Sequence, residues 1–222
     1  MSWIRKIPYD EAEGELREIY DRIAGEDGYL DNILTIHGQR PNTLEGHMAL
    51  YKHVLHSRHN RLPKWRLEML GVFTSILNGC DYCVAHHFEG LRGLLNDDAR
   101  AQALRYGMEE TREAGRGGDA HLRAFDRLVQ GGVLEAVDRA MLAYAHKLTL
   151  SPGAMEAADV EVLRAVGCDE GEILEINQVV SYFAYVNRTA TGLGVDLDGD
   201  TLGLSPGEGD DPDNWRHDAP RE

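Results

Sequence analysis

The chain has 222 residues, of which 42% are hydrophobic, so it is long enough for one sizeable core and too short for several independent domains. Its formal net charge is −15, from 38 acidic against 23 basic residues, and such a field repels nucleic-acid phosphates and anionic lipid surfaces. We therefore expect no nucleic-acid and no membrane partner, and, because the first residues contain no signal-like apolar run, a cytoplasmic protein.

Apolar residues recur at helical spacing through most of the chain, and no segment alternates convincingly as a strand does. The fold class is therefore predicted to be all-α. The predicted helices cover residues 10–24, 41–55, 63–78, 80–95, 96–107, 119–130, 133–149, 155–166 and 170–190. The last of these is too apolar for a solvent-facing helix, which predicts that it belongs to the core or to an interface.

The chain is expected to form one helical domain over residues 1–197, interrupted by a flexible linker at about residues 108–119, where the composition turns charged and rich in glycine. Residues 198–222 form an acidic C-terminal tail with eight acidic residues against two arginines. Such a composition cannot bury enough apolar surface to order itself. We nevertheless predict that Trp215 attaches this tail to a neighbouring surface.

Two cysteines and a histidine fall on one face of the helix predicted after Gly79. Cys83 and His87 lie three and seven residues beyond Cys80, and these spacings bring side chains together on a helix. The two thiols are close enough to cycle between dithiol and disulfide. The partial positive charge of the helix N-terminus favours a thiolate, and His87 can accept or pass on a proton.

Glu68 belongs to the same predicted site, although it lies on the preceding helix. Its neighbours in the sequence are apolar and are expected to lie in the core, where burial of a carboxylate costs free energy unless the group has a partner. We expect it to orient and charge the imidazole of His87 across the bend at Gly79. The site residues predicted to be catalytic are thus Cys83, Cys80, His87 and Glu68.

Other interpretations of these residue types were weighed. A Cys-x-x-Cys pair is often half of a zinc site, but structural zinc usually takes four ligands and a second pair of cysteines is absent from the sequence. Cys168 is expected to be an ordinary buried thiol. The histidines at 47, 53, 56 and 59 are interpreted as a solvated helix end, and Arg188 either lines a substrate pocket or pairs with a core carboxylate. We expect no metal and no cofactor.

The pattern Glu-x11-Cys-x2-Cys-x3-His, from Glu68 to His87, resembles the alkylhydroperoxidase D branch of the carboxymuconolactone decarboxylase superfamily. The stretches 76–82 and 182–195 are similar to its peroxidase-related proteins, and the resemblance spans about residues 5–197. It implies an AhpD-like helical bundle that assembles into trimers or hexamers. The family carries a histidine just before the second cysteine, where this chain carries Tyr82.

The resemblance also implies an activity, thiol-dependent reduction of hydroperoxides. Cys83 would attack the peroxide oxygen to give a sulfenic acid, Cys80 would resolve it as a disulfide, and Glu68 with His87 would relay protons. A lipoylated or thioredoxin-like protein, or another thiol system, would supply the electrons. Two alternatives stay open: a redox-sensing oligomer without significant turnover, which the acidic tail and the 108–119 segment favour, and a lactone decarboxylase, which would need no cysteine pair.

Overall fold

The computed structural model describes residues 2–25, 28–113, 119–206 and 214–218 of the chain. The described part folds into helices and their connections, as predicted. The α-helices are α1 (Gly14–Ile23), α2 (Asn32–His37), α3 (Pro41–Leu55), α4 (Lys64–Asn78), α5 (Asp81–Leu95), α6 (Asp98–Glu113), α7 (Ala120–Gln130), α8 (Ala136–Leu150), α9 (Ala157–Ala165) and α10 (Glu170–Gly192). Two short 3₁₀ helices cover Tyr9–Glu11 and Pro152–Ala154.

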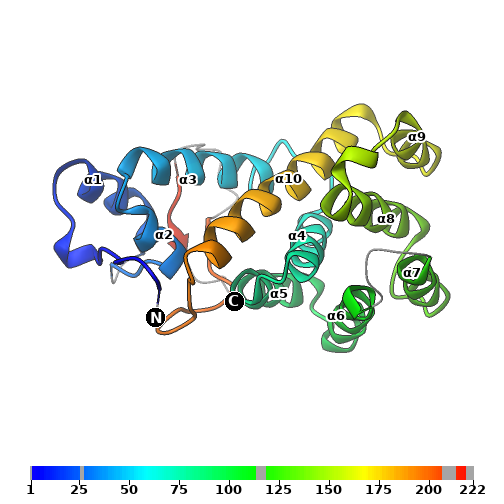
Figure 1. Cartoon of the computed structure of the whole chain (residues 1–222), viewed down its shortest axis with the longest axis horizontal. Coiled ribbons are helices and arrows are strands. Elements are labelled where there is room, and N and C mark those ends of the chain that lie inside the picture. Colours follow the sequence, from blue (N-terminus) through cyan, green and yellow to red (C-terminus); the bar gives the residue numbers. More distant parts are fainter. Residues whose placement is uncertain (1, 26–27, 114–118, 207–213, 219–222) are drawn as a thin grey trace.

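Helix α4 lies at the centre of the molecule, packed against α5, α8 and α10. Figure 1 shows α1 to α3 on one side of this centre and α6 to α9 on the other, with the long α10 crossing between them. The approach of α10 to α4 is close because Gly71 has no side chain: a Cβ built there would lie 2.2 Å from the ring of Phe183. The prediction that 170–190 is a core helix is confirmed, since Phe183 is fully buried.

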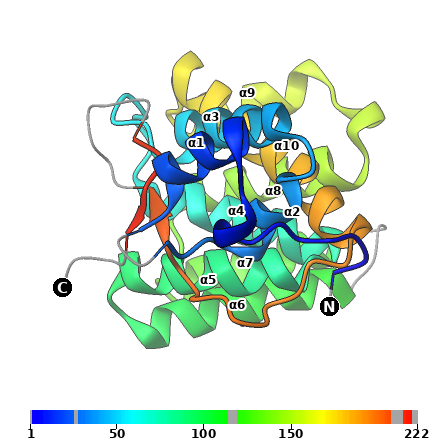
Figure 2. The ribbon, with the colours of Figure 1, turned by 90° about the vertical axis from the view of Figure 1, so that its left-hand side faces the viewer.

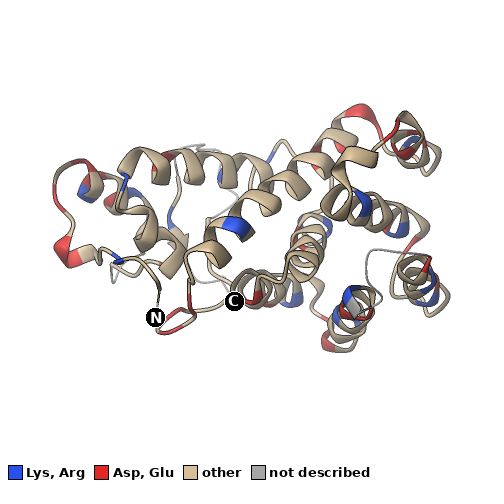
Figure 3. Cartoon of the chain, in the orientation of Figure 1, with Lys and Arg blue, Asp and Glu red and all other residues tan. Residues whose placement is uncertain are grey.

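The outer helices carry the charged residues in opposite-sign pairs. Figure 3 shows both signs of charge on α6 to α9, and three ion pairs join neighbouring helices there: Arg127 with Glu110, Arg139 with Asp126 and Lys147 with Asp159. Among the described helices, none combines the length and the hydropathy that a bilayer crossing requires.

Three element boundaries differ from the sequence-based expectations. The first predicted helix is split into Tyr9–Glu11 and α1, and α2 forms where a loop was expected. Helix α6 continues to Glu113, so the predicted linker is wrong for residues 108–113. Met108 is fully buried there, and its charged neighbours are good helix formers. The rest of the predicted linker, residues 114–118, lies outside the described residues.

The described part of the acidic tail lies against the helices. Trp215 is 3% exposed and the guanidinium of Arg22 stacks on its ring at 3.8 Å, which confirms that this tryptophan attaches the tail. Two-residue strands, β1 (Ser205–Pro206) and β2 (His217–Asp218), pair antiparallel beside the helices (Figure 2). The division of the chain into a domain ending at 197 and a separate tail stays a prediction.

Candidate functional site

A cavity of about 740 Å³ lies between the helices and the C-terminal segment. Helices α3, α4, α5 and α10 supply one wall, with Tyr51, Glu68, Cys83 and Tyr182 among the lining residues. Residues 202–206, Asn214 and His217 supply the other. The cavity is therefore closed by a part of the chain more than one hundred residues away from the cysteines.

The bend between α4 and α5 sets the position of the two thiols. Gly79 ends α4 in the left-handed conformation, with φ at 70°, which glycine adopts without steric cost. The chain thereby turns directly into α5. Cys80 is the N-cap of this helix, one residue before its first helical residue, Asp81. The sulfur of Cys80 accepts a hydrogen bond from the backbone N–H of Cys83 at 3.4 Å. Cys80 and Cys83 are free thiols and both are buried.

The pKa values of the two thiols are shifted in opposite directions. Hydrogen bonds from the Cys83 thiol and its backbone N–H, together with those from Thr191 and Asn187, lower the pKa of Cys80 to about 7, against the effect of burial. Burial, and then the neighbouring sulfur of Cys80, raise the pKa of Cys83 well above its usual range. The negative charge that the pair acquires near pH 7 therefore resides on Cys80, while Cys83 lines the cavity.

Asn187 ties the thiol pair to the rest of the core. Its amide group donates to the hydroxyl of Ser75 at 2.9 Å and accepts from the amide of Asn78 at 3.0 Å. The side chain is 1% exposed. These two contacts fix the orientation of an amide that also hydrogen-bonds both sulfurs. In the sequence this residue belongs only to the 182–195 stretch that is similar to the peroxidase-related proteins.

The structure brings Glu68 and His87 together across the bend, as expected. Oε2 of Glu68 lies 2.8 Å from Nδ1 of His87, and Glu68 is 3% exposed. The His87 ring meets Phe183 edge to face, with centroids 4.6 Å apart. Both His87 and Glu68 line the cavity with Cys83. The four predicted residues therefore share one site, and their catalytic roles stay predictions.

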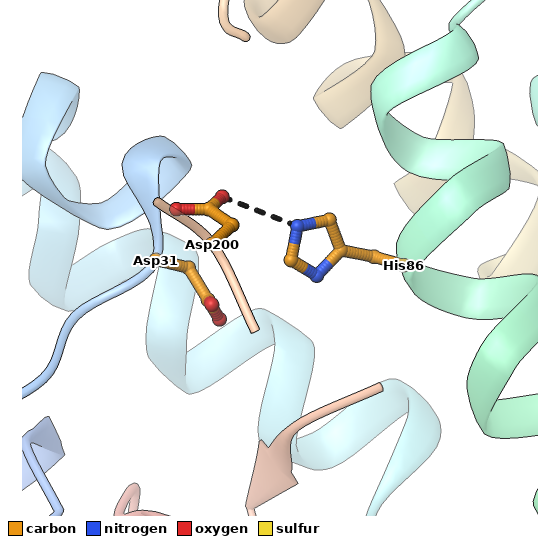
Figure 4. Close-up of side chains that lie close together, drawn as sticks. All are labelled: Asp31, His86 and Asp200. Atoms are coloured by element: carbon orange, nitrogen blue, oxygen red, sulfur yellow. Dashed lines mark hydrogen bonds and ion pairs between the residues drawn. The ribbon is translucent and has the colours of Figure 1, made fainter. Parts of the chain in front are cut away.

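His86 also belongs to the cavity wall, although its place on the helix puts it off the face of Cys80. Its Nε2 lies 3.2 Å from Oδ2 of Asp200 (Figure 4). That oxygen also accepts a hydrogen bond from the hydroxyl of Tyr82 at 2.8 Å. Asp31 stands beside them and is 5% exposed. Burial, and then the charge of Asp200, raise the pKa of Asp31 to about 6. Local sequence spacing carries no signal for these long-range partners.

The histidines between 47 and 59 divide into two kinds. His53 and His59 are exposed, but His47 and His56 are 4% and 1% exposed, so a solvated helix end is wrong for these two. Burial lowers the pKa of His47 and of His56 well below the usual value. Both rings lie against Tyr51, which makes this wall of the cavity aromatic and uncharged.

Two further residues singled out in the sequence lie away from the site. Cys168 is buried, and burial raises its pKa, as befits an ordinary core thiol. Arg188 is exposed and donates to the carbonyl of Ala184 on its own helix, so it neither lines the cavity nor pairs with a core carboxylate.

Comparison with known proteins identifies one matching family model and several structures with a similar fold. Residues 41–116 match a sequence model of the carboxymuconolactone decarboxylase family. No curated protein matches the sequence significantly. Among solved structures, an uncharacterized peroxidase-related protein from Ralstonia eutropha JMP134, with an alkylhydroperoxidase AhpD core, has 23% identity and a TM-score of 0.67, with 88% of this chain and 91% of that chain covered.

Two other solved structures share the fold. A peroxidase-related protein from Silicibacter sp. TM1040 has 24% identity and a TM-score of 0.62, with 87% of each chain covered. The debrominase Bmp8 has 16% identity and a TM-score of 0.63, with 88% of this chain and 90% of that chain covered. At these identities the similarity establishes a common fold.

Proposed function

We propose that the chain, in which residues 41–116 match the carboxymuconolactone decarboxylase family and which shares the fold of AhpD-like proteins, is a thiol-dependent hydroperoxide reductase. The proposal rests chiefly on one observation: Cys83 lines a large buried cavity together with the paired Glu68 and His87. A second thiol, Cys80, lies within hydrogen-bond reach of Cys83, so an oxidised sulfur at Cys83 has a resolving partner beside it.

The charge on Cys80 provides the base that activates Cys83. The proton of the Cys83 thiol moves along its hydrogen bond to the Cys80 thiolate, which leaves a thiolate at Cys83 facing the cavity. A thiolate is the nucleophilic form of cysteine, whereas a thiol is not. In the resting state the negative charge is therefore on Cys80, and during the reaction it moves to Cys83, which faces the substrate cavity.

The Cys83 thiolate attacks one peroxide oxygen. An S–O bond forms, the O–O bond breaks, and the departing alkoxide takes a proton from the Glu68 and His87 pair to become an alcohol. Cys80 then attacks the sulfenic sulfur: an S–S bond forms, the S–O bond breaks, and the Cys80 proton passes through the Glu68 and His87 pair to the departing hydroxide, which leaves as water. One thiol, one thiolate, one hydroperoxide and one proton, taken up by the pair from solvent, thus give one disulfide, one alcohol and one water. An external dithiol returns the two electrons.

Turnover of cumene or tert-butyl hydroperoxide with a dithiol tests this proposal. Cys83→Ser is expected to abolish turnover. Cys80→Ser, which lacks both the proposed base and the resolving thiol, is expected to react slowly and to stop after one step with a sulfenic acid at Cys83 that dimedone captures. Cys168→Ser is the matched control, since this buried thiol lies outside the cavity, and it is expected to keep wild-type turnover. Equal turnover in wild type and Cys83→Ser would refute the function. Dimedone capture at Cys80 in Cys83→Ser would reverse the order of the thiols.

The electron donor is proposed to be a lipoylated or thioredoxin-like protein, and the chain is proposed to assemble into trimers or hexamers. Apolar side chains exposed on two long helices support assembly: Leu174 and Tyr185 on α10 are 60% and 42% exposed, and Leu50 on α3 is 39% exposed. Light scattering of the purified chain measures its mass. A monomeric mass at micromolar concentration would exclude these assemblies.

Reductive dehalogenation is a second candidate, favoured by the aromatic wall that Tyr51, Tyr182 and His47 give the cavity. One solved structure with this fold is a debrominase variant in complex with 2,3,4-tribromopyrrole. Incubation of the reduced chain with that compound and measurement of released bromide separates the two activities. Bromide release that depends on Cys83, without hydroperoxide turnover, would replace the first proposal by the second.

A further inference from the structure

Three side chains with metal-binding atoms converge at one edge of the cavity. Asp31 comes from the N-cap of α2, His86 from α5, and Asp200 from the segment after α10 (Figure 4). One ligand atom from each lies within 4.8 Å of the other two. Asp31 and His86 are buried and Asp200 is half-buried, so the cluster belongs to the interior wall and not to an exposed acidic patch.

Each carboxylate is held in place by neutral donors. Asp31 accepts from the hydroxyl of Tyr29 at 2.9 Å, and Asp200 accepts from the hydroxyl of Tyr82 and from the backbone N–H of Asn32. Hydrogen bonds of this kind orient metal ligands in known sites and are needed for full affinity. The ligands are therefore already fixed, from three separate segments, before any ion binds.

In the described part of the chain, the two carboxylates are buried or half-buried with one imidazole, that of His86, beside them. Among the residues that the structure describes, no ion pair joins Asp31 or Asp200 to a lysine or arginine. Two carboxylates this close together are costly to bury unless a positive charge lies between them. We propose that Asp31, His86 and Asp200 bind one divalent cation of the first transition-metal row.

The donor set narrows the choice of ion. Two carboxylate oxygens and one imidazole nitrogen suit Mn²⁺, Fe²⁺ or Zn²⁺, whereas Mg²⁺ and Ca²⁺ favour oxygen ligands throughout. Ligands about 2.0 to 2.2 Å from one ion lie at most about 4.4 Å apart. The separation of His86 from Asp200, 3.2 Å, already satisfies this limit, and a small movement of Asp31 completes the set.

The bound ion would join the segment that closes the cavity to the helices that carry the thiols. Asp200 stands in the segment after α10, two residues before Leu202 of the cavity wall, while His86 stands three residues after Cys83. Because Asp31 and His86 line the cavity, a coordination position of the ion faces that space. The proposal is independent of the hydroperoxide chemistry, since it involves none of the four residues predicted to react.

Titration of the full chain with Mn²⁺ tests the proposal, because this hard ion binds oxygen and nitrogen in preference to thiolate sulfur. Calorimetry is expected to give one bound Mn²⁺ per chain, and 100 times the Kd is expected to raise the Tm by about 5 °C or more. Asp200→Asn, Asp31→Asn and His86→Gln are each expected to weaken binding at least about tenfold. Asp198→Asn is the matched control on the same segment, with an exposed side chain, and is expected to bind as the wild type does.

A second measurement needs no substitution. Co²⁺ added to the wild-type chain is expected to give the weak visible bands of nitrogen and oxygen ligation, without the intense near-ultraviolet band of cobalt bound to thiolate. The intense band would place the ion at Cys80 and Cys83 and overturn the proposal. So would the absence of saturable Mn²⁺ binding up to millimolar concentration, or equal binding by the wild type and all three cluster variants, whether or not the chain reduces hydroperoxides.

Discussion

The resting charge of the thiol pair leads to a quantitative prediction. With a pKa of about 7, Cys80 is about half ionised at pH 7, whereas a free cysteine with a pKa near 8.5 is only about 3% ionised. Cys83 and Cys168 both have raised pKa values. Ultraviolet titration of thiolate absorbance is therefore expected to show one thiol of three ionising near pH 7, and Cys80→Ser is expected to remove that step.

Asn187 contributes one of the hydrogen bonds that stabilise this thiolate. A hydrogen bond to a charged group is worth about 1.5 kcal/mol or more, and one pKa unit corresponds to about 1.36 kcal/mol. Asn187→Ala is thus expected to raise the midpoint of the Cys80 titration by at most about one unit, because Asn187 makes the smallest of the contributions that lower this pKa. The effect also predicts slower reaction with hydroperoxide at pH 7 and partial recovery at pH 8.

Asn177→Ala is the matched control, because this amide lies on the same helix and hydrogen-bonds Tyr144, away from the sulfurs. It is expected to leave the midpoint near pH 7. The reasoning would be refuted if no thiol of the wild-type chain ionised between pH 6 and 8. It would also be refuted if Asn187→Ala and Asn177→Ala gave the same midpoint.

Two further substitutions test burial and packing. Burial, and then two neighbouring histidines, lower the pKa of His217 to about 3, so the stability that this neutral ring contributes is complete above pH 6.5 and is lost as the pH falls towards 3. From pH 7 to pH 5, the free energy of unfolding measured in urea is expected to fall by about 2 kcal/mol less in His217→Gln than in the wild type. His53→Gln is the exposed control and is expected to behave as the wild type does. Equal pH dependence in all three proteins would contradict this. Gly71→Ala is expected to lose about 1 to 3 kcal/mol of unfolding free energy because its Cβ would overlap Phe183. Gly46→Ala is the control: nothing lies within 4 Å of its Cβ, so it should be neutral or stabilising. Similar unfolding free energies for the two alanine variants would rule out the close approach of α10 to α4.

The parts of the site that were predictable lie within twenty residues of one another. Helical spacing from Cys80 to His87, and a carboxylate one helix earlier, follow from local geometry, and the contact of Glu68 with His87 agrees with that expectation. Asp31 and Asp200 were not predictable because only tertiary packing joins them to His86. No local periodicity encodes a contact across more than one hundred residues.

Errors in the secondary structure have equally specific causes. Helix α2 is only six residues long, too short for a helical period to stand out. Residues 108–113 were expected to be a linker because of their charge, but Met108 and Thr111 are buried, and this packing extends α6. His47 and His56 were interpreted as solvated because imidazole is polar, whereas aromatic neighbours and His217 from the tail enclose this region.

Residues 202–206, Asn214 and His217 form one wall of the cavity, and under the proposed function this wall would select the molecules that reach the thiols. The four residues proposed to react lie within residues 41–116, which match the family model, while the opposite wall comes from a short stretch outside it. Exchange of that stretch for another sequence would retarget the same thiols to molecules of a different shape, with no helix altered.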